Sequence, residues 1–375
     1  MLIELYIFSF IIVAYGTFTT LALIGFGRLR EKVKETSTID VYISIVISAR
    51  NEEALINECL QQIIKQNFLK ENFELILIDD ASEDNTYQIA LKTLQNSDIS
   101  YQLIRKETHQ GKKRNLSEAI QKAKGSIIIT SDADVIYRNP DWLLTIYRYF
   151  KNYSPNMLIM PIDFETQSGF LNKFQIIENL ALTAITAGYC GIKKPFMCNG
   201  ANLAFTKNAY NHVNGYQSHL HISSGEDIFL LEEIKKIDSN SIHYGLIREF
   251  IVKTKTVNTI DNLFKQRVRW ASKAKYNSNN INLFASFIIL AANLLFLALF
   301  VAILKKSVII PYLSIFVLAK FVFDFLLLFL ASNFLGRTKQ IWWLIPFECI
   351  YWLYAFIIGI GSLFLKPYWK GKKIN

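Results

Sequence analysis

The sequence predicts a doubly wound parallel α/β domain flanked by transmembrane helices, and three observations predict it. In a globular region between about residues 39 and 276, short β-branched runs alternate with helical segments up to Asp134, which is the order of a parallel sheet wrapped by helices; the alternation weakens after Asp134. Long apolar segments lie before and after that region. Hydrophobic residues make up 51% of the 375 residues and the mean hydropathy is +0.22, which are high values for a soluble protein.

The composition also limits the partners. The net charge of +10 suits nucleic acid, an anionic membrane surface or phosphorylated substrates. Because the sequence has no motif that enters a nucleic-acid groove, we expect membrane lipids as partners and no nucleic acid. Four cysteines show neither paired metal spacing nor a disulfide framework, so they fit a reducing cytosol and are interpreted as structural; they are Cys59, Cys190, Cys198 and Cys349.

Residues 1–27 are predicted to form an N-terminal transmembrane helix. Glu4 is the only charged residue of this segment, which is long enough to cross a bilayer. No basic region precedes it and no small-residue cleavage site stands out, so an uncleaved anchor is favoured over a signal peptide. The basic residues that follow favour a cytoplasmic location for residues 39–276; they are Arg28, Arg30, Lys32 and Lys34.

Two carboxylates, Asp132 and Asp134, directly follow the run from Ile127 to Ser131. This run is β-branched and continuous, which is typical of a buried parallel strand. Ligands of open α/β sheets bind beyond the carboxyl ends of the strands, and carboxylates at i and i+2 can hold a hard divalent cation that also contacts phosphate oxygens. An Asp-containing turn is the alternative interpretation, and it is the commoner one for an isolated D-x-D.

Polar clusters also follow the predicted strands at 42–48, 74–78 and 100–104. Since three strands end in this way, we expect a nucleotide pocket at that edge of the sheet. The clusters are Ala49 to Glu53, the Asp79-Asp80 pair and the run from His109 to Arg114.

Two predicted helices further along the chain carry polar residues. Glu226 and Asp227 begin one of them, where carboxylates are common caps. Gln266, Arg269 and Trp270 lie at i, i+3 and i+4 of the other and therefore share one face. An amide, a guanidinium and an indole on one face suit phosphate binding and sugar stacking, whereas Trp270 alone could be an interfacial anchor.

Two segments of this region have alternative interpretations that involve the membrane surface. The amphipathic segment 170–186 is interpreted as core in preference to a membrane-surface helix. Seven basic residues lie between positions 253 and 275, and a membrane-proximal stripe attracted to anionic lipid accounts for four of them; these are Lys265, Arg267, Lys273 and Lys275.

Residues 282–365 are predicted to form a C-terminal membrane region of up to three helices, at 282–304, 308–331 and 341–365. Lys320 and Asp324 lie four residues apart, so they can pair on one helix face, whereas Glu348 is interpreted as an isolated charge. Three full crossings would place the basic C-terminal residues outside, against the positive-inside tendency. Pro346 and Glu348 mark the last segment as the candidate for a re-entrant or interfacial arrangement.

Five of these stretches, in order, resemble motifs of the membrane-bound family 2 glycosyltransferases of the GT-A fold. The family includes cellulose, chitin, hyaluronan and poly-N-acetylglucosamine synthases and ceramide glucosyltransferase. SIVISARNEE resembles its first strand and nucleotide loop, LILIDDASEDNT its DD-x-S motif, SDAD its D-x-D motif, GED its acceptor-side ED motif and QRVRW its Q-x-x-R-W motif. Each motif is weak alone, but five in order at predicted element boundaries are a strong signal. FMCNGAN resembles the family's acceptor loop only loosely. The family usually has Thr or Ser before ED, and in this chain that position is followed by Gly225.

The resemblance implies how the donor is bound. Asp134 would hold Mg²⁺ or Mn²⁺ across the diphosphate of a nucleotide sugar, with Asp132 near the ribose or the metal. The nucleotide is usually a uridine diphosphate, and its base and ribose would contact Ala49, Glu52, Asp79 and Asp80. Lys112 and Arg114 would meet phosphate, with a solvated surface patch as the alternative.

On the acceptor side, the resemblance implies that Asp227, with Glu226 beside it, is the general base. Gln266 and Arg269 would grip the diphosphate, and Trp270 would stack on the acceptor sugar. The implied activity is inverting transfer from a UDP-sugar to a lipid or lipid-linked glycan by a multi-pass protein of the plasma (inner) membrane. A processive polysaccharide synthase, a nucleotidyl or phosphoryl transferase and a non-catalytic membrane scaffold with a degenerate nucleotide fold are the alternatives.

Overall fold

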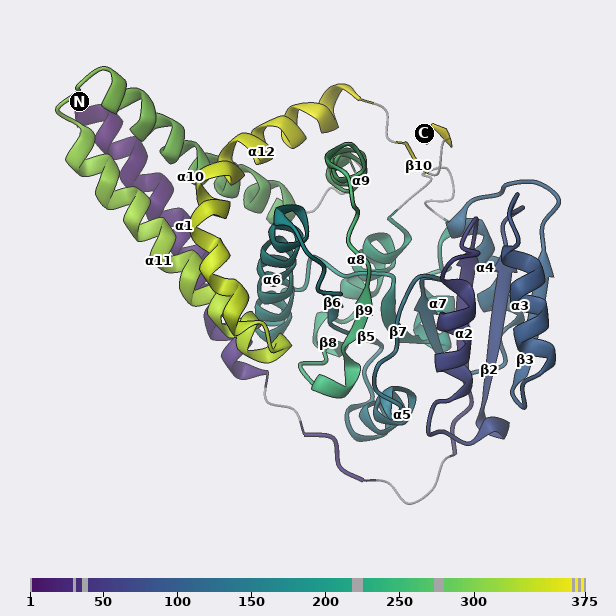
Figure 1. Cartoon of the computed structure of the whole chain (residues 1–375). Coiled ribbons are helices and arrows are strands. Elements are labelled where there is room, and N and C mark those ends of the chain that lie inside the picture. The colour runs from purple at the N-terminus through teal and green to yellow at the C-terminus, as the bar shows by residue number, and fades with distance from the viewer. Residues whose placement is uncertain are drawn as a thin grey trace. The chain divides into compact units, whose positions relative to one another are not determined.

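A computed structural model describes residues 2–29, 32–35, 40–217, 225–272, 280–365, 368–369 and 372–373. The chain divides into two compact units, both drawn in Figure 1. The α/β unit comprises Leu29–Glu165 and Lys193–Lys255, and the helical unit comprises Met1–Arg28, Thr166–Ile192 and Thr256–Asn375. The sequence predicted one continuous domain from 39 to 276, whereas two segments of that range cluster with the apolar helices.

The central sheet of the α/β unit has seven strands in the order β3-β2-β1-β4-β7-β5-β8. β3, β2, β1 and β4 run parallel to one another, as predicted. β7 pairs antiparallel with both β4 and β5, so the sheet as a whole is mixed, and the part that the sequence predicted as parallel, before Asp134, is parallel. The strands are β1 Ile43–Ala49, β2 Phe73–Asp79, β3 Ser100–Arg105, β4 Ile127–Ser131, β5 Met157–Ile159, β7 Asn202–Thr206 and β8 Ile242–Tyr244, with β6 Ile162–Phe164 and β9 Val252–Thr254 in a separate pair.

The direction of β7 has a consequence for the site. Asn202 opens this strand opposite Ser131, the last residue of β4. An antiparallel strand begins where its neighbour ends, so the loop before β7 lies at the edge where the carboxylates after β4 also lie.

Helices cover both faces of the sheet. Alternate residues of β1, which point to one face, form a buried core with α2, α3 and α5. α4 also packs against β1 and β2, but none of its residues belongs to that core, so it covers the other face of the sheet. α5 was not predicted from the sequence. The helices of this unit are α2 Ile56–Ile64, α3 Thr86–Gln95, α4 Lys112–Lys122, α5 Trp142–Tyr153, α7 Lys207–His212 and α8 Glu226–Ile237, with 3-10 turns at Lys70–Asn72, Ser239–Ser241 and Arg248–Phe250.

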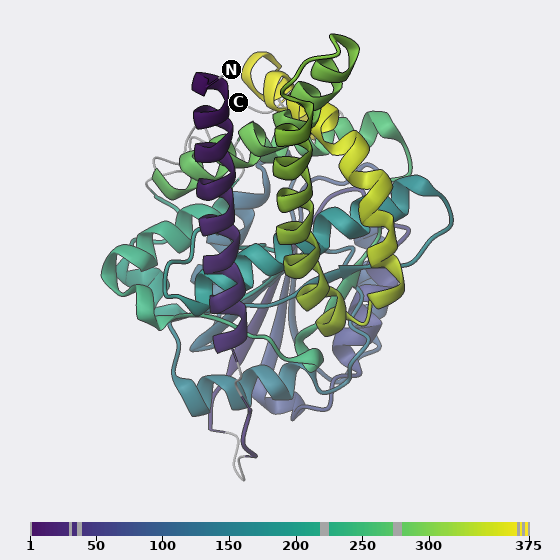
Figure 2. The same cartoon turned by 90° about the vertical axis from the view of Figure 1, so that its left-hand side faces the viewer.

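Among its described residues, the helical unit contains four segments long and apolar enough to cross a membrane, namely α1, α10, α11 and Thr338–Phe364. α1, α10 and α11 pack on one another, and α1 and α11 run alongside each other in Figure 2. The elements of this unit are α1 Leu2–Arg28, α6 Phe170–Gly191, α9 Ile260–Ser272, α10 Asn280–Leu304, α11 Ile310–Leu335, the 3-10 helix Thr338–Trp343, α12 Leu344–Phe364, and the short strands β10 Tyr368–Trp369 and β11 Lys372–Lys373.

A buried charged cluster joins three of these helices. The Nζ atom of Lys320 lies 2.7 Å from Oδ2 of Asp324, which confirms the predicted pair on α11. The same Nζ lies 2.5 Å from Oε2 of Glu348 on α12, so the prediction that Glu348 is isolated is wrong. Tyr15 on α1 donates a hydrogen bond to Asp324. A buried ammonium needs such partners in apolar surroundings. The residue spacing within α11 predicts the pair with Asp324, but it cannot reveal a partner on α12.

α6 packs against α1 and α11, so the preferred core interpretation holds within the helical unit. Small residues let the backbones of α1 and α6 meet. A methyl group added at Gly188 would lie 2.2 Å from the carbonyl oxygen of Ala22, and one added at Gly191 would lie 2.0 Å from that of Gly25. Close backbone contact of this kind is typical of helix pairs in membranes, where packing drives association.

We predict that Gly188→Ala destabilises the helical unit. Alanine favours a helix by about 1 kcal/mol over glycine, but the new methyl group overpacks the contact with α1 at a typical cost of about 1–3 kcal/mol. The melting temperature of the purified protein in detergent should therefore fall. Gly27→Ala is the matched control, because no atom lies within 4 Å of the added methyl group. A melting temperature for Gly188→Ala that equals or exceeds that of the control would contradict the packing.

Candidate active site

The predicted carboxylates lie at one edge of the sheet. Asp79 ends β2 and Asp80 follows it, and Asp132 and Asp134 follow the end of β4. β2 and β4 both run parallel to β1, which lies between them. The carboxyl ends of the three strands, and the two carboxylate pairs with them, therefore meet at the same edge.

Asp80 is fully buried and holds the loop that leads into α4. Its Oδ1 accepts a hydrogen bond of 2.8 Å from the Gln110 amide, and its Oδ2 accepts one of 3.1 Å from the Gly111 amide. The Nδ1 atom of His109 lies 2.7 Å from Oδ2. Gly111 has a φ of +91°, a conformation that favours glycine. Asp80 thus has a structural task that the sequence did not indicate, and its contact with a nucleotide stays a prediction.

Asp79 has a different environment from its neighbour. Its Oδ2 accepts a hydrogen bond of 3.3 Å from the amide of Ser82. Its Oδ1 is buried, and the described residues provide it with no hydrogen-bond partner. A buried acceptor without a donor is costly, so this oxygen is suited to accept a hydrogen bond from a bound ligand.

Lys112, the first residue of α4, connects two motifs. Its Nζ lies 2.6 Å from Oδ1 of Asp132 and 3.1 Å from Oε1 of Glu226. Burial acts to lower the pKa of Lys112, but the charges of Asp132 and Glu226 outweigh it, and the pKa lies above its ordinary value. The side chain is therefore an ammonium between two carboxylates. Arg114, two residues further along the helix, is exposed.

Asp134 and Asp132 have the chemistry that a hard cation requires. Asp134 Oδ2 accepts a hydrogen bond of 3.4 Å from Thr254 on β9, and both carboxylates are only partly buried. Across the described residues, no three His, Cys, Asp or Glu side chains gather closely enough to hold a metal by themselves. The two carboxylates nevertheless fit Mg²⁺ or Mn²⁺, because such ions take one or two carboxylates and complete their shell with water and phosphate oxygens.

Asp227 is held at the start of α8. Its Oδ2 accepts a hydrogen bond of 3.1 Å from the amide of Gly200, in the loop before β7. Its Oδ1 accepts one of 2.9 Å from the amide of Ile228. Tyr216 lies nearby, and burial first, then the charges of Tyr210, Glu226 and Asp227, raise its pKa, so the phenol stays protonated. The loosely matching loop FMCNGAN is therefore part of the site.

A residue that sequence reasoning missed, Arg50, shapes the loop after β1. It is 4% exposed, and its Nη1 donates hydrogen bonds to the carbonyl oxygens of Asp80 and Ala81, at 2.7 and 2.9 Å. Ala49, the last residue of β1, precedes it, and the amide of Glu52 donates to Thr86 Oγ1 at 2.7 Å. A single arginine after a strand is a weak sequence signal for a buried structural residue, because its hydrogen-bond acceptors lie about 30 residues away in the sequence.

The Q-x-x-R-W residues belong to the helical unit, where α9 carries Gln266, Arg269 and Trp270 in partly buried positions. Arg267 is 4% exposed and pairs with Glu178, so its assignment to a lipid-facing basic stripe is wrong. A buried guanidinium needs a carboxylate partner, and the charge pattern of one helix does not reveal one on another. Lys265 is exposed and pairs with Asp261 at 2.6 Å, and the side chains of Lys273 and Lys275 lie outside the described residues.

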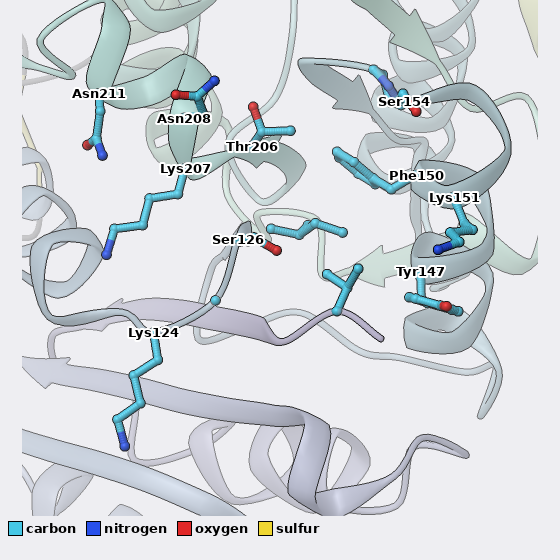
Figure 3. Close-up of a pocket in the computed structure, with 14 residues that line it drawn as sticks. Lys124, Ser126, Tyr147, Phe150, Lys151, Ser154, Thr206, Lys207, Asn208 and Asn211 are labelled. Atoms are coloured by element: carbon cyan, nitrogen blue, oxygen red, sulfur yellow. The ribbon is translucent and has the colours of Figure 1, made fainter. Parts of the chain in front are cut away.

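A cavity of about 670 Å³ lies at the opposite end of β4 (Figure 3). It is lined by Ser126 and Ile127 at the start of that strand, by Thr206 at the end of β7, and by Tyr147 and Phe150 of α5. Since the carboxylates follow the other end of β4, this cavity is separate from the candidate site.

Comparisons with known proteins agree with this geometry. Residues 44–212 match the family model described as Glycosyl transferase family 2. The poly-beta-1,6-N-acetyl-D-glucosamine synthase of Staphylococcus epidermidis is 24% identical over 233 residues, which cover 61% of this chain and 53% of that protein. The poly(ribitol-phosphate) beta-glucosyltransferase of Bacillus spizizenii is 34% identical over 109 residues, which cover 29% of this chain and 17% of that protein. The alignment with the synthase thus spans about half of that protein's length.

A solved structure extends the likeness to the fold. A mannosyltransferase from Pyrobaculum calidifontis, in complex with GDP-Man and Mn2+, aligns with a TM-score of 0.56 at 14% identity, covering 95% of this chain and 99% of that chain. At this identity the likeness bears on the fold alone. It confirms the predicted glycosyltransferase GT-A fold, here with a mixed sheet.

We predict that Asp80→Asn loosens the loop before α4. The substitution removes the charge that binds two amides, and hydrogen bonds to a charged group typically contribute about 1.5–3 kcal/mol. Hydrogen exchange at the amides of Gln110 and Gly111 should accelerate by at least about tenfold, since about 1.4 kcal/mol corresponds to that factor. Asp98→Asn, at an exposed position, is the control. Unchanged protection in Asp80→Asn would show that the carboxylate does not hold the loop.

Proposed function

We propose that this chain, which carries a glycosyl transferase family 2 domain over residues 44–212, is an inverting glycosyltransferase that moves a sugar from a UDP-sugar to a hydroxyl of a membrane-associated acceptor. One observation carries the proposal. The ammonium of Lys112 binds Asp132 of the D-x-D motif and Glu226 of the E-D motif at a single edge of the sheet. Donor-side and acceptor-side carboxylates thus share one site, as transfer between two bound substrates requires.

The donor half of the site suits a nucleotide. The buried Oδ1 of Asp79 can accept a hydrogen bond from the base or the ribose. Ala49 and Glu52, at the end of β1 and in the loop after it, and Asp80, directly after β2, would contact the same part of the nucleotide. Lys112 offers an ammonium to the diphosphate, with its charge assured by its raised pKa. Neutralising the negative charge of the departing diphosphate is what makes it a good leaving group.

Asp134, with Asp132, would hold Mg²⁺ or Mn²⁺ at the diphosphate. The bound cation would supply Lewis-acid stabilisation of the charge that develops on the leaving group. By the position at which they would hold the cation, the two carboxylates would set the side of the site on which the diphosphate lies. Thr254 keeps Asp134 in place by its hydrogen bond.

The acceptor half of the site needs a base. As the acceptor oxygen attacks the anomeric carbon, the bond from that carbon to the diphosphate oxygen breaks and UDP departs. The proton of the acceptor hydroxyl moves to the carboxylate of Asp227, which the Gly200 amide holds in position. A single displacement of this kind inverts the anomeric carbon and needs no protein nucleophile.

Three residues of the helical unit are assigned roles because they match the Q-x-x-R-W motif. Gln266 and Arg269 would bind the diphosphate, since an amide and a guanidinium both donate hydrogen bonds to phosphate oxygens. Trp270 would stack on the acceptor sugar.

A membrane-associated acceptor accords with the four apolar helices. We propose a multi-pass protein of the plasma (inner) membrane with its catalytic unit in the cytoplasm, as the basic residues after α1 favour. A processive polysaccharide synthase is the second candidate, because a relative aligned over 233 residues is a poly-beta-1,6-N-acetyl-D-glucosamine synthase.

Incubation of membranes containing the protein with radiolabelled UDP-sugars tests the proposal. We expect UDP release and label in solvent-extractable lipid. Label in high-molecular-weight material that a polysaccharide hydrolase cleaves would favour the synthase. If no UDP-sugar is consumed but a GDP-sugar is, the uridine assignment is wrong, and if neither is consumed, the catalytic proposal fails.

Asp134→Asn should abolish transfer while the protein stays folded, because the cation loses a charged ligand. Turnover and thermal unfolding are measured together, with Asp98→Asn as the surface control. Chelation by EDTA should abolish wild-type activity, and added Mg²⁺ or Mn²⁺ should restore it. Full activity in excess EDTA would overturn the metal assignment.

Asp227→Asn should lower turnover by about 10²- to 10⁴-fold, which is the usual contribution of a general base. The amide is nearly isosteric and can still accept from the Gly200 amide, but it cannot take up a proton. UDP affinity, measured by calorimetry on the same protein, should change little. Preserved turnover with a large loss of UDP affinity would give Asp227 a structural role instead.

A further inference from the structure

Arg267, the residue after the Gln of Q-x-x-R-W, contacts two side chains of that motif. Its Nη1 donates a hydrogen bond to Oε1 of Gln266. Its guanidinium carbon lies 4.2 Å from the centroid of the Trp270 ring, within the range of a cation–π contact. One buried cation therefore contacts both the Gln and the Trp of the motif.

Two other helices hold Arg267 in place. Its Nε lies 2.8 Å from Oε2 of Glu178 on α6, and its Nη2 lies 2.5 Å from the same oxygen. The hydroxyl of Tyr354 on α12 donates a hydrogen bond of 2.8 Å to the other oxygen, Oε1 of Glu178. Burial acts to lower the pKa of Arg267, but the charge of Glu178 outweighs it and raises the pKa, so the guanidinium remains a cation.

Packing between α9 and α12 supports the same arrangement. A methyl group added at Gly361 of α12 would lie 3.0 Å from Cγ2 of Val268 and 3.1 Å from the Phe264 ring. The two helices thus approach closely at Val268, the residue that follows Arg267.

Stability is a poor explanation for such a buried pair. Desolvation of two charges often cancels their attraction, and an apolar pair of similar volume is commonly neutral or more stabilising. What an apolar pair cannot do is fix the orientation of a polar neighbour. The guanidinium has five donors and no acceptor, so Gln266 must turn its amide oxygen toward Arg267 and its NH₂ group elsewhere.

We propose that Arg267 and Glu178 are positioning residues that set the diphosphate-binding end of Gln266 and the sugar-binding face of Trp270. With its oxygen bonded to Arg267, Gln266 presents its NH₂ donors, the end that an anionic diphosphate requires. With one indole face occupied by the guanidinium, Trp270 offers the opposite face for stacking. The roles of diphosphate and acceptor sugar rest on the proposed function, whereas the two orientations rest on the contacts.

The test removes the whole network at once. Glu178→Leu, Arg267→Met and Tyr354→Phe combined leave no buried charge or hydroxyl without its partner, and the melting temperature should stay near that of the wild type. Turnover should fall by up to about 10²-fold, the loss that small misplacements of substrate-positioning groups produce. The same triple change in a Gln266→Ala/Trp270→Ala background should cause no further loss, because the network acts through those two residues.

A second readout does not depend on activity. The readout is acrylamide quenching of Trp270 fluorescence. The Trp270 signal of each protein is obtained by subtracting the signal of its Trp270→Phe counterpart. Quenching should increase in the triple variant, because the guanidinium no longer covers the ring. The matched control is Asp261→Asn/Lys265→Met, which removes an exposed ion pair on the same helix and should change neither readout.

The outcomes are distinguishable. Wild-type turnover together with unchanged Trp270 quenching in the triple variant would overturn the positioning role. So would a loss of turnover that is additive with Gln266→Ala/Trp270→Ala, since that indicates a general structural effect. If the wild type consumes no nucleotide sugar, the proposed function fails, and the change in Trp270 quenching alone then decides whether the network orients the motif.

Discussion

Repulsion between carboxylates is the constraint on which the edge of the sheet depends. Six carboxylates come from three motifs of the α/β unit, and several lie within reach of one cation. Like charges at short range in a partly buried site oppose folding unless each is compensated. The structure compensates four of them directly: Lys112 lies between Asp132 and Glu226, loop amides bind Asp80, and the Gly200 amide binds Asp227. Charge compensation therefore ties the loop before α4, the loop before β7 and the start of α8 to the same edge.

The antiparallel direction of β7 makes that compensation possible. A parallel strand beside β4 would have begun at the opposite end, and its preceding loop would have lain near the cavity of Figure 3. Instead Asn202 starts beside Ser131, and Gly200 reaches Asp227 from two residues before the strand. A side chain at position 200 would contact the Asp227 side chain, since an added methyl group lies 3.4 Å from its Cβ. Strand direction and the small residue together place a backbone donor at the proposed base.

Local signals made much of this predictable, and long-range partners account for what was missed. The continuous β-branched run before Asp132 identified β4 and its polar exit, because burial of a parallel strand leaves a local pattern. The direction of β7 leaves no such pattern in five residues. Arg50 and Arg267 look like surface cations in the sequence, yet each is buried on acceptors that lie 30 and 89 residues away in the sequence, respectively. A charge pattern specifies a helix face, but the partner that decides burial comes from another element.

α12 illustrates how such partners organise the helical unit. The sequence made this segment the candidate for a re-entrant or interfacial arrangement, in part because of Glu348. In the structure Glu348 binds Lys320 of α11, and Tyr354, on the same helix, binds Glu178 of α6. One helix thus supplies an acceptor to the buried ammonium and a donor to the carboxylate that holds Arg267. Polar contacts in apolar surroundings fix a single register, because any shift would leave a buried group without its partner. Glu348 and Tyr354 of α12 therefore align α11 and α6 with it, and α9 through Glu178, within the unit.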